Sequence, residues 1–201
     1  HGAQAVALAD RILDAKSADR VVAHSNFGEI LRAAGKTSQA IAQITTAEEL
    51  AKAANGERSE LFGQLLSIEA SMRQELGELK QAVATAKRAC EILAFAQGDE
   101  SATVATCWAD AANIMIEAGE VRPGLARLDA IMPTLVASYG EDHAIVANAH
   151  ISRGDALLQL HDYAGSAVAF ERGRVGMAAS TIEPGYLASA EWGLGQALVQ
   201  R

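Results

Sequence analysis

Glycine residues recur at a spacing of 42 positions, and this period is the strongest constraint on what the chain can fold into. The first glycine series comprises Gly35, Gly77 and Gly119, and its next position holds His161. The second glycine series, with the same spacing, comprises Gly56, Gly98 and Gly140. Two independent series that share one period indicate an array of similar structural units, each too small to bury a core alone.

The glycines predict two turns in every unit. A residue just past the end of a helix often adopts the left-handed conformation, which glycine enters without steric cost. Three positions after each glycine of the second series comes a residue suited to the N-cap of a helix, a third column that reads Ser17, Ser59, Ser101 and His143. We therefore expect each unit to consist of a helix A, a tight turn, a helix B and a capped turn into the next unit.

Small residues occupy the columns at which two helices would have to approach closely. In the middle of helix A this column reads Gly28, Ala70, Ala112 and Gly154. Early in helix B it reads Ala40, Ala82, Gly124 and Ser166. Small residues flanked by apolar ones allow helices to interlock at a short interaxial distance, so these columns predict tightly packed helix pairs.

Composition supports an all-α chain. Half of the 201 residues are apolar but only 4% are aromatic, and three prolines leave long stretches free to stay helical. Apolar residues do not alternate with polar ones as they would in strands. The formal net charge of −8 disfavours direct contact with nucleic acid, and no apolar run is long enough to span a membrane.

The register predicts about ten helices in one domain that covers residues 1–201. The expected helices are 3–15, 18–34, 37–54, 58–76, 79–96, 101–118, 122–138, 143–160, 163–180 and 184–201. The domain would consist of a half repeat at 1–16, complete repeats at 17–58, 59–100, 101–142 and 143–183, and a half repeat at 184–201.

The pattern resembles the tetratricopeptide repeat (TPR) family across essentially the whole chain. Shared features are the small residue in helix A, the glycine between helices A and B, and an aromatic position early in helix A. That position is filled by His24, Leu66, Trp108, His150 and Trp192. The 42-residue length and the stretch 140–147 are similar to the kinesin-light-chain subtype. The resemblance implies an α-solenoid with a right-handed superhelical twist.

In the TPR family helix A lines a concave groove that binds extended peptides or helices. Transferred to this chain, the resemblance implies that the groove is formed by Asn26, Glu29, Ser67, Ser71, Glu75, Asp110, Asn113, Glu117, Asn148, Ser152 and Asp155. Amide and hydroxyl groups can bind a peptide backbone, and the five carboxylates would attract a basic side chain. The alternative is that these residues form only a solvated surface.

The sequence contains no pattern that indicates catalysis, a cofactor or a metal. His143 and His150 are two helical turns apart and have no third ligand nearby in the sequence, so no metal site is expected. Gly193-Leu194-Gly195 lacks the third glycine and the preceding strand of a dinucleotide loop. No serine lies in a nucleophile elbow. We therefore expect a protein that is not an enzyme.

Cys90 and Cys107 show neither CxxC nor zinc-type spacing, and two cysteines do not form a disulfide framework. We expect two free thiols in helices and a cytoplasmic location. Arginines outnumber lysines 12 to 5, which is typical of GC-rich bacteria, and the first residue is His1. We therefore expect a fragment of a larger bacterial protein.

Together these patterns predict a protein-interaction scaffold that binds a protein segment in its groove, and the groove carboxylates favour a basic segment. Bacterial arrays of this subtype often adjoin signalling domains, so the resemblance implies a signalling or regulatory parent protein. The alternative is a structural array that forms homo-oligomers through its terminal helices, since apolar residues such as Leu194 and Leu198 continue to the end of the chain.

Overall fold

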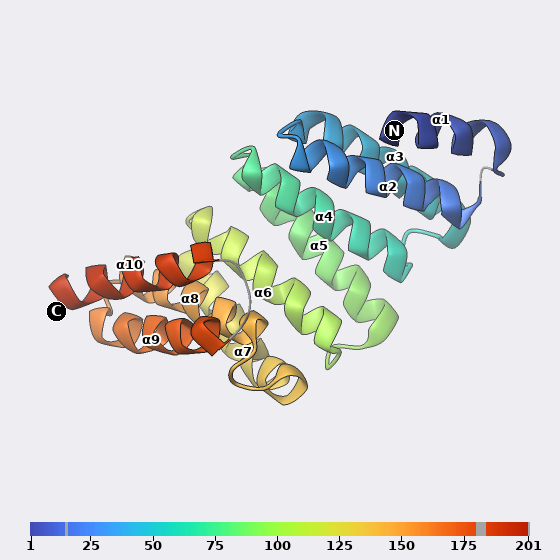
Figure 1. Ribbon diagram of the computed structural model, residues 1–201. Helices are drawn as coiled ribbons and strands as arrows, with labels where there is room; N and C mark the ends of the chain where they lie inside the picture. The colour runs from blue at the N-terminus through green and yellow to red at the C-terminus, as the bar shows by residue number, and fades with distance from the viewer. Residues whose placement is uncertain (15, 180–183, 201) are drawn as a thin grey trace. The chain divides into compact units, whose positions relative to one another are not determined.

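A computed structural model describes residues 1–14, 16–179 and 184–200, and in this part of the chain it contains ten α-helices and no strand (Figure 1). The helices are α1 (Gly2–Ile12), α2 (Ala18–Ala33), α3 (Thr37–Asn55), α4 (Glu60–Glu75), α5 (Leu79–Gln97), α6 (Ala102–Glu117), α7 (Val121–Tyr139), α8 (Ala144–Gln159), α9 (Tyr163–Ala179) and α10 (Pro184–Gln200). The predicted all-α class is confirmed. Predicted helix ends at residues 15, 180 and 201 lie outside the described residues.

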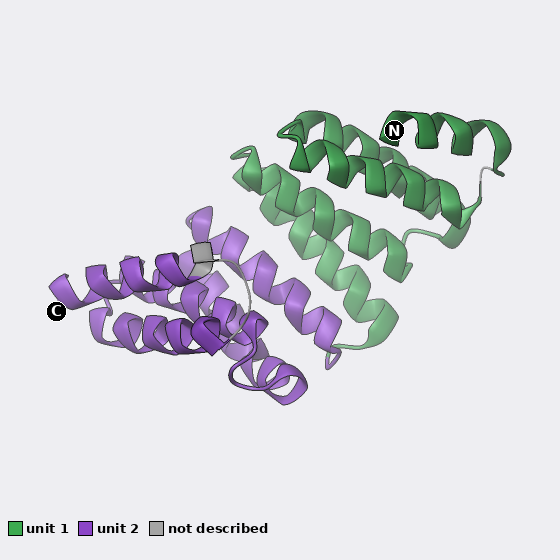
Figure 2. Ribbon diagram, in the orientation of Figure 1, with its two compact units in different colours: residues 1–99 green, residues 100–201 purple. Residues whose placement is uncertain are grey.

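The helices group into two compact units, residues 1–99 and residues 100–201 (Figure 2). Consecutive helices pack against each other from α1 to α5 in unit 1 and from α6 to α10 in unit 2. In unit 2 the A helices α6, α8 and α10 also contact one another in sequence order. The boundary between the units lies one residue before a predicted repeat boundary. One continuous array over residues 1–201 stays a prediction.

Helices A begin at the predicted cap column. Ser17, Ser59, Ser101 and His143 are the N-cap residues of α2, α4, α6 and α8. The Ser59 hydroxyl accepts a hydrogen bond from the Phe62 backbone N–H at 3.3 Å. His143 does the same with Nδ1, which accepts from the Ile145 N–H at 3.2 Å. The cap column therefore stabilises orphan N–H groups at these helix starts even where histidine replaces serine.

The turn between helices A and B requires a left-handed residue. Gly77 has a φ of +74°, and its N–H and that of Glu78 donate to the carbonyls of Gln74 and Arg73, both at 2.9 Å. His161 occupies the equivalent position with a φ of +62°, the single positive φ outside glycine among the described residues. The 42-residue spacing therefore repeats a left-handed backbone conformation. His161 adopts this conformation although it is unfavourable for a residue that carries a side chain.

Exchanging side chains at this turn should change stability in opposite directions. We expect Gly77→Val to lower the free energy of unfolding by roughly 1 kcal/mol or more, because a β-branched residue is strained at positive φ. His161→Gly should raise it by about 0.5 to 1 kcal/mol by removing that strain. Urea unfolding followed by circular dichroism measures both. If both variants match the parent chain, the turn conformation is not what requires glycine.

The small-residue columns lie at the helix contacts. Ala70, Ala82 and Ala112 are fully or almost fully buried. A Cβ atom added to Gly124 would lie 2.9 Å from the Ala112 carbonyl oxygen, closer than real Cβ contacts. The Ser166 hydroxyl donates to the Gly154 carbonyl at 2.9 Å, so the two columns meet directly in unit 2. The predicted close packing is confirmed.

Two expectations about the environment of the chain have different outcomes. No described helix combines the length and apolar character needed to cross a bilayer. The expectation of free thiols is wrong, because Cys90 and Cys107 are both disulfide-bonded. A disulfide depends on Cα distances in the folded chain, which spacing in the sequence does not reveal. Since disulfides are rare in reducing compartments, the cysteines no longer support the cytoplasmic location, which stays a prediction.

Candidate functional site

The helix A residues of unit 1 are connected by an arginine that the groove prediction omitted. Arg32 extends from α2 to α4, where its Nε donates to Glu75 Oε1 at 2.7 Å and its Nη2 to Ser71 Oγ at 3.3 Å. Its Nη1 also lies 3.6 Å from Glu29 Oε2. The structure therefore brings the predicted groove residues Glu29, Ser71 and Glu75 together, but around the guanidinium of Arg32.

Arg32 weakens the case for a basic ligand in unit 1, because both carboxylates already have a positive partner. The hydrogen bond to Glu75 raises the pKa of the arginine further, so the pair stays charged. A sequence signal for this pairing existed. Glu29 and Arg32 are three residues apart on one helix, and Glu75 follows Arg32 by one repeat length plus one residue.

Unit 2 has a different electrostatic arrangement on its helix A surface. Asp110 on α6 and Asp155 on α8 are exposed and form no hydrogen bond or ion pair with any described residue. The surrounding protein nevertheless removes part of their hydration, and this desolvation raises the pKa of each carboxyl group to about 6. Because α6 packs against α8, unit 2 presents two unneutralised carboxylates on adjacent helices.

The other predicted groove residues differ in how far they reach solvent. Asn26 in unit 1 and Glu117 in unit 2 are exposed, whereas Asn113 and Asn148 are half-buried on α6 and α8. Ser152 is buried. Ser67 is half-buried and donates to the Gly63 carbonyl of its own helix at 3.3 Å. The two serines therefore have less capacity for a ligand than the sequence pattern indicated.

Glu69, Arg73 and Arg153 stand where the TPR pattern has apolar residues, and each of them forms an ion pair. Arg73 donates to Glu69 Oε1 through Nη2 at 2.6 Å and to Glu78 Oε2 through Nη1 at 2.7 Å. Arg153 on α8 donates through Nε to Asp129 Oδ1 on α7 at 2.8 Å. These departures from the family pattern replace apolar contacts with charge pairs and leave the helices in place.

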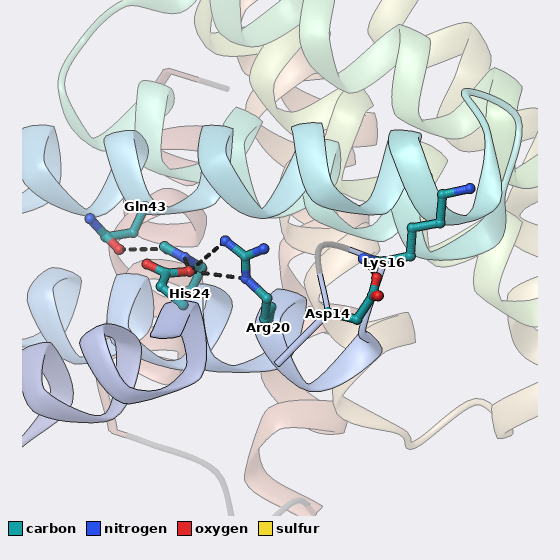
Figure 3. Close-up of polar contacts among 6 residues, drawn as sticks. Asp14, Lys16, Arg20, His24 and Gln43 are labelled. Carbon is teal, nitrogen blue, oxygen red and sulfur yellow. Dashed lines mark hydrogen bonds and ion pairs between the residues drawn. The ribbon is translucent and has the colours of Figure 1, made fainter. Parts of the chain in front are cut away.

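The aromatic column early in helix A contains a hydrogen-bonded histidine in unit 1 (Figure 3). His24 is buried, with Nδ1 2.9 Å from Gln43 Oε1 on α3 and Nε2 3.2 Å from Asp10 Oδ1 on α1. Asp10 also accepts from Arg20, through Nε at 3.0 Å and Nη2 at 2.7 Å. Both nitrogens of this imidazole are therefore satisfied by flanking helices.

Two buried polar side chains lack such partners. Neither ring nitrogen of His150 on α8 has a hydrogen-bond partner, and neither does Oε1 of Glu48 on α3. Burial lowers the pKa of His150, and Arg172 and Arg153 lower it to a smaller degree, whereas Glu141 raises it. Unsatisfied buried polar atoms are uncommon in folded proteins, so both positions need an explanation. No pattern in the sequence indicated a role for Glu48 or a ligand for His150.

No family model matches the sequence, and no curated protein matches it. Solved structures do. BtubC (BKLC) from P. vanneervenii has a TM-score of 0.82 at 19% sequence identity, covering 99% of this chain and 81% of that one. TPR-like repeats assigned to a kinesin light chain of Podosopora anserina have a TM-score of 0.73 at 14% identity, covering 90% and 86%. A point variant of the same repeats has a TM-score of 0.75 at 13% identity, covering 89% and 84%.

These similarities lie in the fold, and they agree with the resemblance that the repeat register indicates. The chain therefore has the TPR-like helical repeat fold.

Proposed function

We propose that this chain is a protein-interaction module that binds a basic polypeptide segment on the helix A surface of unit 2. The observation that supports this proposal is the pair of exposed, unneutralised carboxylates, Asp110 and Asp155, on the adjacent helices α6 and α8. Their raised pKa values mean that a bound cation would recover electrostatic stabilisation that solvent does not provide. Half-buried Asn113 and Asn148 on the same helices supply donors and acceptors for a peptide backbone.

A defined basic peptide tests the proposal. We expect a fluorescein-labelled peptide of alternating lysine and alanine to bind the intact chain, as measured by fluorescence anisotropy. Asp110→Lys with Asp155→Lys should abolish binding while leaving the melting temperature unchanged. Binding should weaken with added salt, because partly exposed charges are screened. It should also weaken as the pH falls through about 6, where the two carboxyl groups become protonated and lose their charge.

The matched control reverses two other exposed carboxylates, Glu49 on α3 and Glu91 on α5. Glu49→Lys with Glu91→Lys changes the net charge by the same amount but alters helices B of unit 1. This variant should bind the peptide as the parent chain does. If both double variants lose affinity equally, the peptide responds only to the total charge of −8 and the helix A surface is not the site.

A second candidate function has its own observation. Trp192, Leu198 and Val199 on α10 are among the most exposed large apolar side chains, with 72% of Trp192 accessible. These residues favour a self-associating array, since exposed apolar patches commonly mark protein interfaces. Sedimentation equilibrium separates the two candidates. Dimers that dissociate on Trp192→Glu support self-association through α10, and monomers at all concentrations contradict it.

A further inference from the structure

A cavity of about 670 Å³ lies between α7, α8 and α9 in unit 2, and its lining includes the unpartnered His150. A second cavity of about 340 Å³ shares His150, Glu141 and Arg172 with the first. His150 is only 5% exposed. It lies about 140° around α8 from Asp155, so this site is separate from the surface proposed above and does not depend on it.

Equivalent positions in other repeats show what this column normally contacts. His24 and His150 are three repeats apart, and the partners of His24 are Asp10 and Gln43. Three repeats later, those two partner positions hold Val136 and Ala169. Both residues line the larger cavity, and neither can hydrogen-bond through its side chain. The cavity therefore occupies the place where unit 1 supplies a carboxylate and an amide.

Repeat 3 confirms that these columns meet in space. Trp108 is one repeat before His150, and Arg127 is one repeat before Ala169. The Arg127 guanidinium lies over the Trp108 ring, 3.9 Å from its centroid. The long side chains at these two positions contact each other in repeats 1 and 3. In repeat 4 the partner position holds an alanine, which leaves the His150 ring beside the cavity without a hydrogen-bond partner in the described part of the chain.

Among the described residues, the lining of the cavity includes one unpaired cation that could hold an anion. Arg172 is exposed, lines both cavities and forms no ion pair with any described residue. Arg153 is already paired with Asp129. The carboxylates of Glu141 and Asp142 also line these cavities and oppose an anion, whereas Glu171 is paired with Arg174. Arg172 nevertheless acts on His150 more strongly than Glu141 does. In unit 1 a guanidinium and an imidazole, those of Arg20 and His24, hold the Asp10 carboxylate in the same way.

We infer that this cavity binds a carboxylate carried on a short aliphatic stem. The ligand carboxylate would accept hydrogen bonds from His150 and Arg172, as Asp10 does from His24 and Arg20. Met132, Val136 and Val168 line the rest of the cavity and would contact the stem. Because the Arg172 side chain is exposed, it can move to admit the ligand. Two sources share this chemistry, a free aliphatic acid and the C-terminal carboxylate of a polypeptide.

Hexanoate is the probe for the shared chemistry, titrated into the intact chain by isothermal calorimetry. A ligand of this size in a preformed cavity should give a dissociation constant on the order of 1 mM. Hexanamide, which has the same shape but no charge, should bind at least about tenfold more weakly, since charge-assisted hydrogen bonds are lost. N-acetyl-leucine represents a polypeptide terminus. Tighter binding of N-acetyl-leucine supports a polypeptide ligand, and tighter binding of hexanoate supports a free acid.

Four variants separate the site from general effects. Arg172→Gln should weaken hexanoate binding by about 10- to 100-fold, whereas Arg122→Gln, on α7 and outside both cavities, should leave it unchanged. Val136→Asp restores the carboxylate that Asp10 provides in unit 1, so it should block binding by occupying the site. His150→Leu copies the Leu66 of repeat 2 and should abolish binding without lowering the melting temperature.

The inference is overturned if neither acid binds at tens of millimolar, which would mean that water alone satisfies His150. It is also overturned if Arg172→Gln and Arg122→Gln bind hexanoate equally. Arg172 is exposed, so its replacement does not endanger folding, and this comparison stays decisive even if a core variant fails to fold.

Discussion

Replacing Phe170 with alanine should lower the free energy of unfolding of unit 2 by about 3 to 5 kcal/mol. Phe170 on α9 is fully buried. A Cβ atom added to Gly154 on α8 would lie 2.8 Å from its ring, and one added to Gly193 on α10 would lie 2.3 Å from it. The ring therefore fills space that these two glycines leave between three helices, and alanine would leave a cavity that the backbone cannot close.

The matched control for Phe170 is another phenylalanine of the same chain. Phe95 on α5 is 65% exposed, and the Arg58 guanidinium lies over its ring, 4.8 Å from the centroid. Phe95→Ala should change stability by less than about 0.5 kcal/mol, as is usual for surface positions. Urea unfolding of both variants measures the difference. Equal losses would mean that the ring of Phe170 is not what holds α8, α9 and α10 together.

Glu48→Gln should stabilise unit 1 at high pH by on the order of 3 to 5 kcal/mol, with a much smaller effect near pH 4.5. Glu48 is only 9% exposed on α3, and burial raises the pKa of its carboxyl group to about 8. The neighbouring Glu69 contributes to this rise, while Arg73 and Arg88 oppose it. Glutamine keeps the shape of the protonated acid and cannot ionise.

The direction of the pH dependence follows from the raised pKa. In the unfolded chain Glu48 ionises near its ordinary pKa of 4.5, whereas in the folded chain it keeps its proton up to about pH 8. Its contribution to stability is complete below pH 4.5 and is lost progressively as the pH rises to 8. The neighbouring Glu69 differs in its contacts, because Arg73 donates two hydrogen bonds to its carboxylate.

Unfolding at pH 5 and pH 9 tests this prediction, with Glu49→Gln as the control. Glu49 is the next residue on α3 and is exposed, so its replacement should change stability by less than about 0.5 kcal/mol at both pH values. A gain for Glu48→Gln that is the same at pH 5 and pH 9 would contradict a buried carboxyl group with a raised pKa. Equal gains for the two variants would contradict a role for burial.

The 42-residue period was sufficient to predict the ten described helices, because their turns depend on local backbone conformation. Gly77 and Gly119 have positive φ as the spacing predicted, and Ser59 caps α4 at the expected residue. Left-handed turns and caps are formed by residues within one helical turn of each other. Local order of this kind can be recognised in sequence without knowing which helices are neighbours. Gly193 lies in a stretch that does not match a dinucleotide loop, and in the structure it is a packing position for Phe170.

Only the tertiary structure decided which polar groups are free to act. Glu29 and Asp110 look alike in the sequence, yet Arg32 neutralises the first while the second has no counter-ion among the described residues. His24 and His150 occupy one repeat position, and the difference between them comes from residues of flanking helices, Asp10 in one case and Val136 in the other. Charge pairing and desolvation depend on atoms that lie close in space and far apart in the chain, whereas helix periodicity depends on neighbours along it.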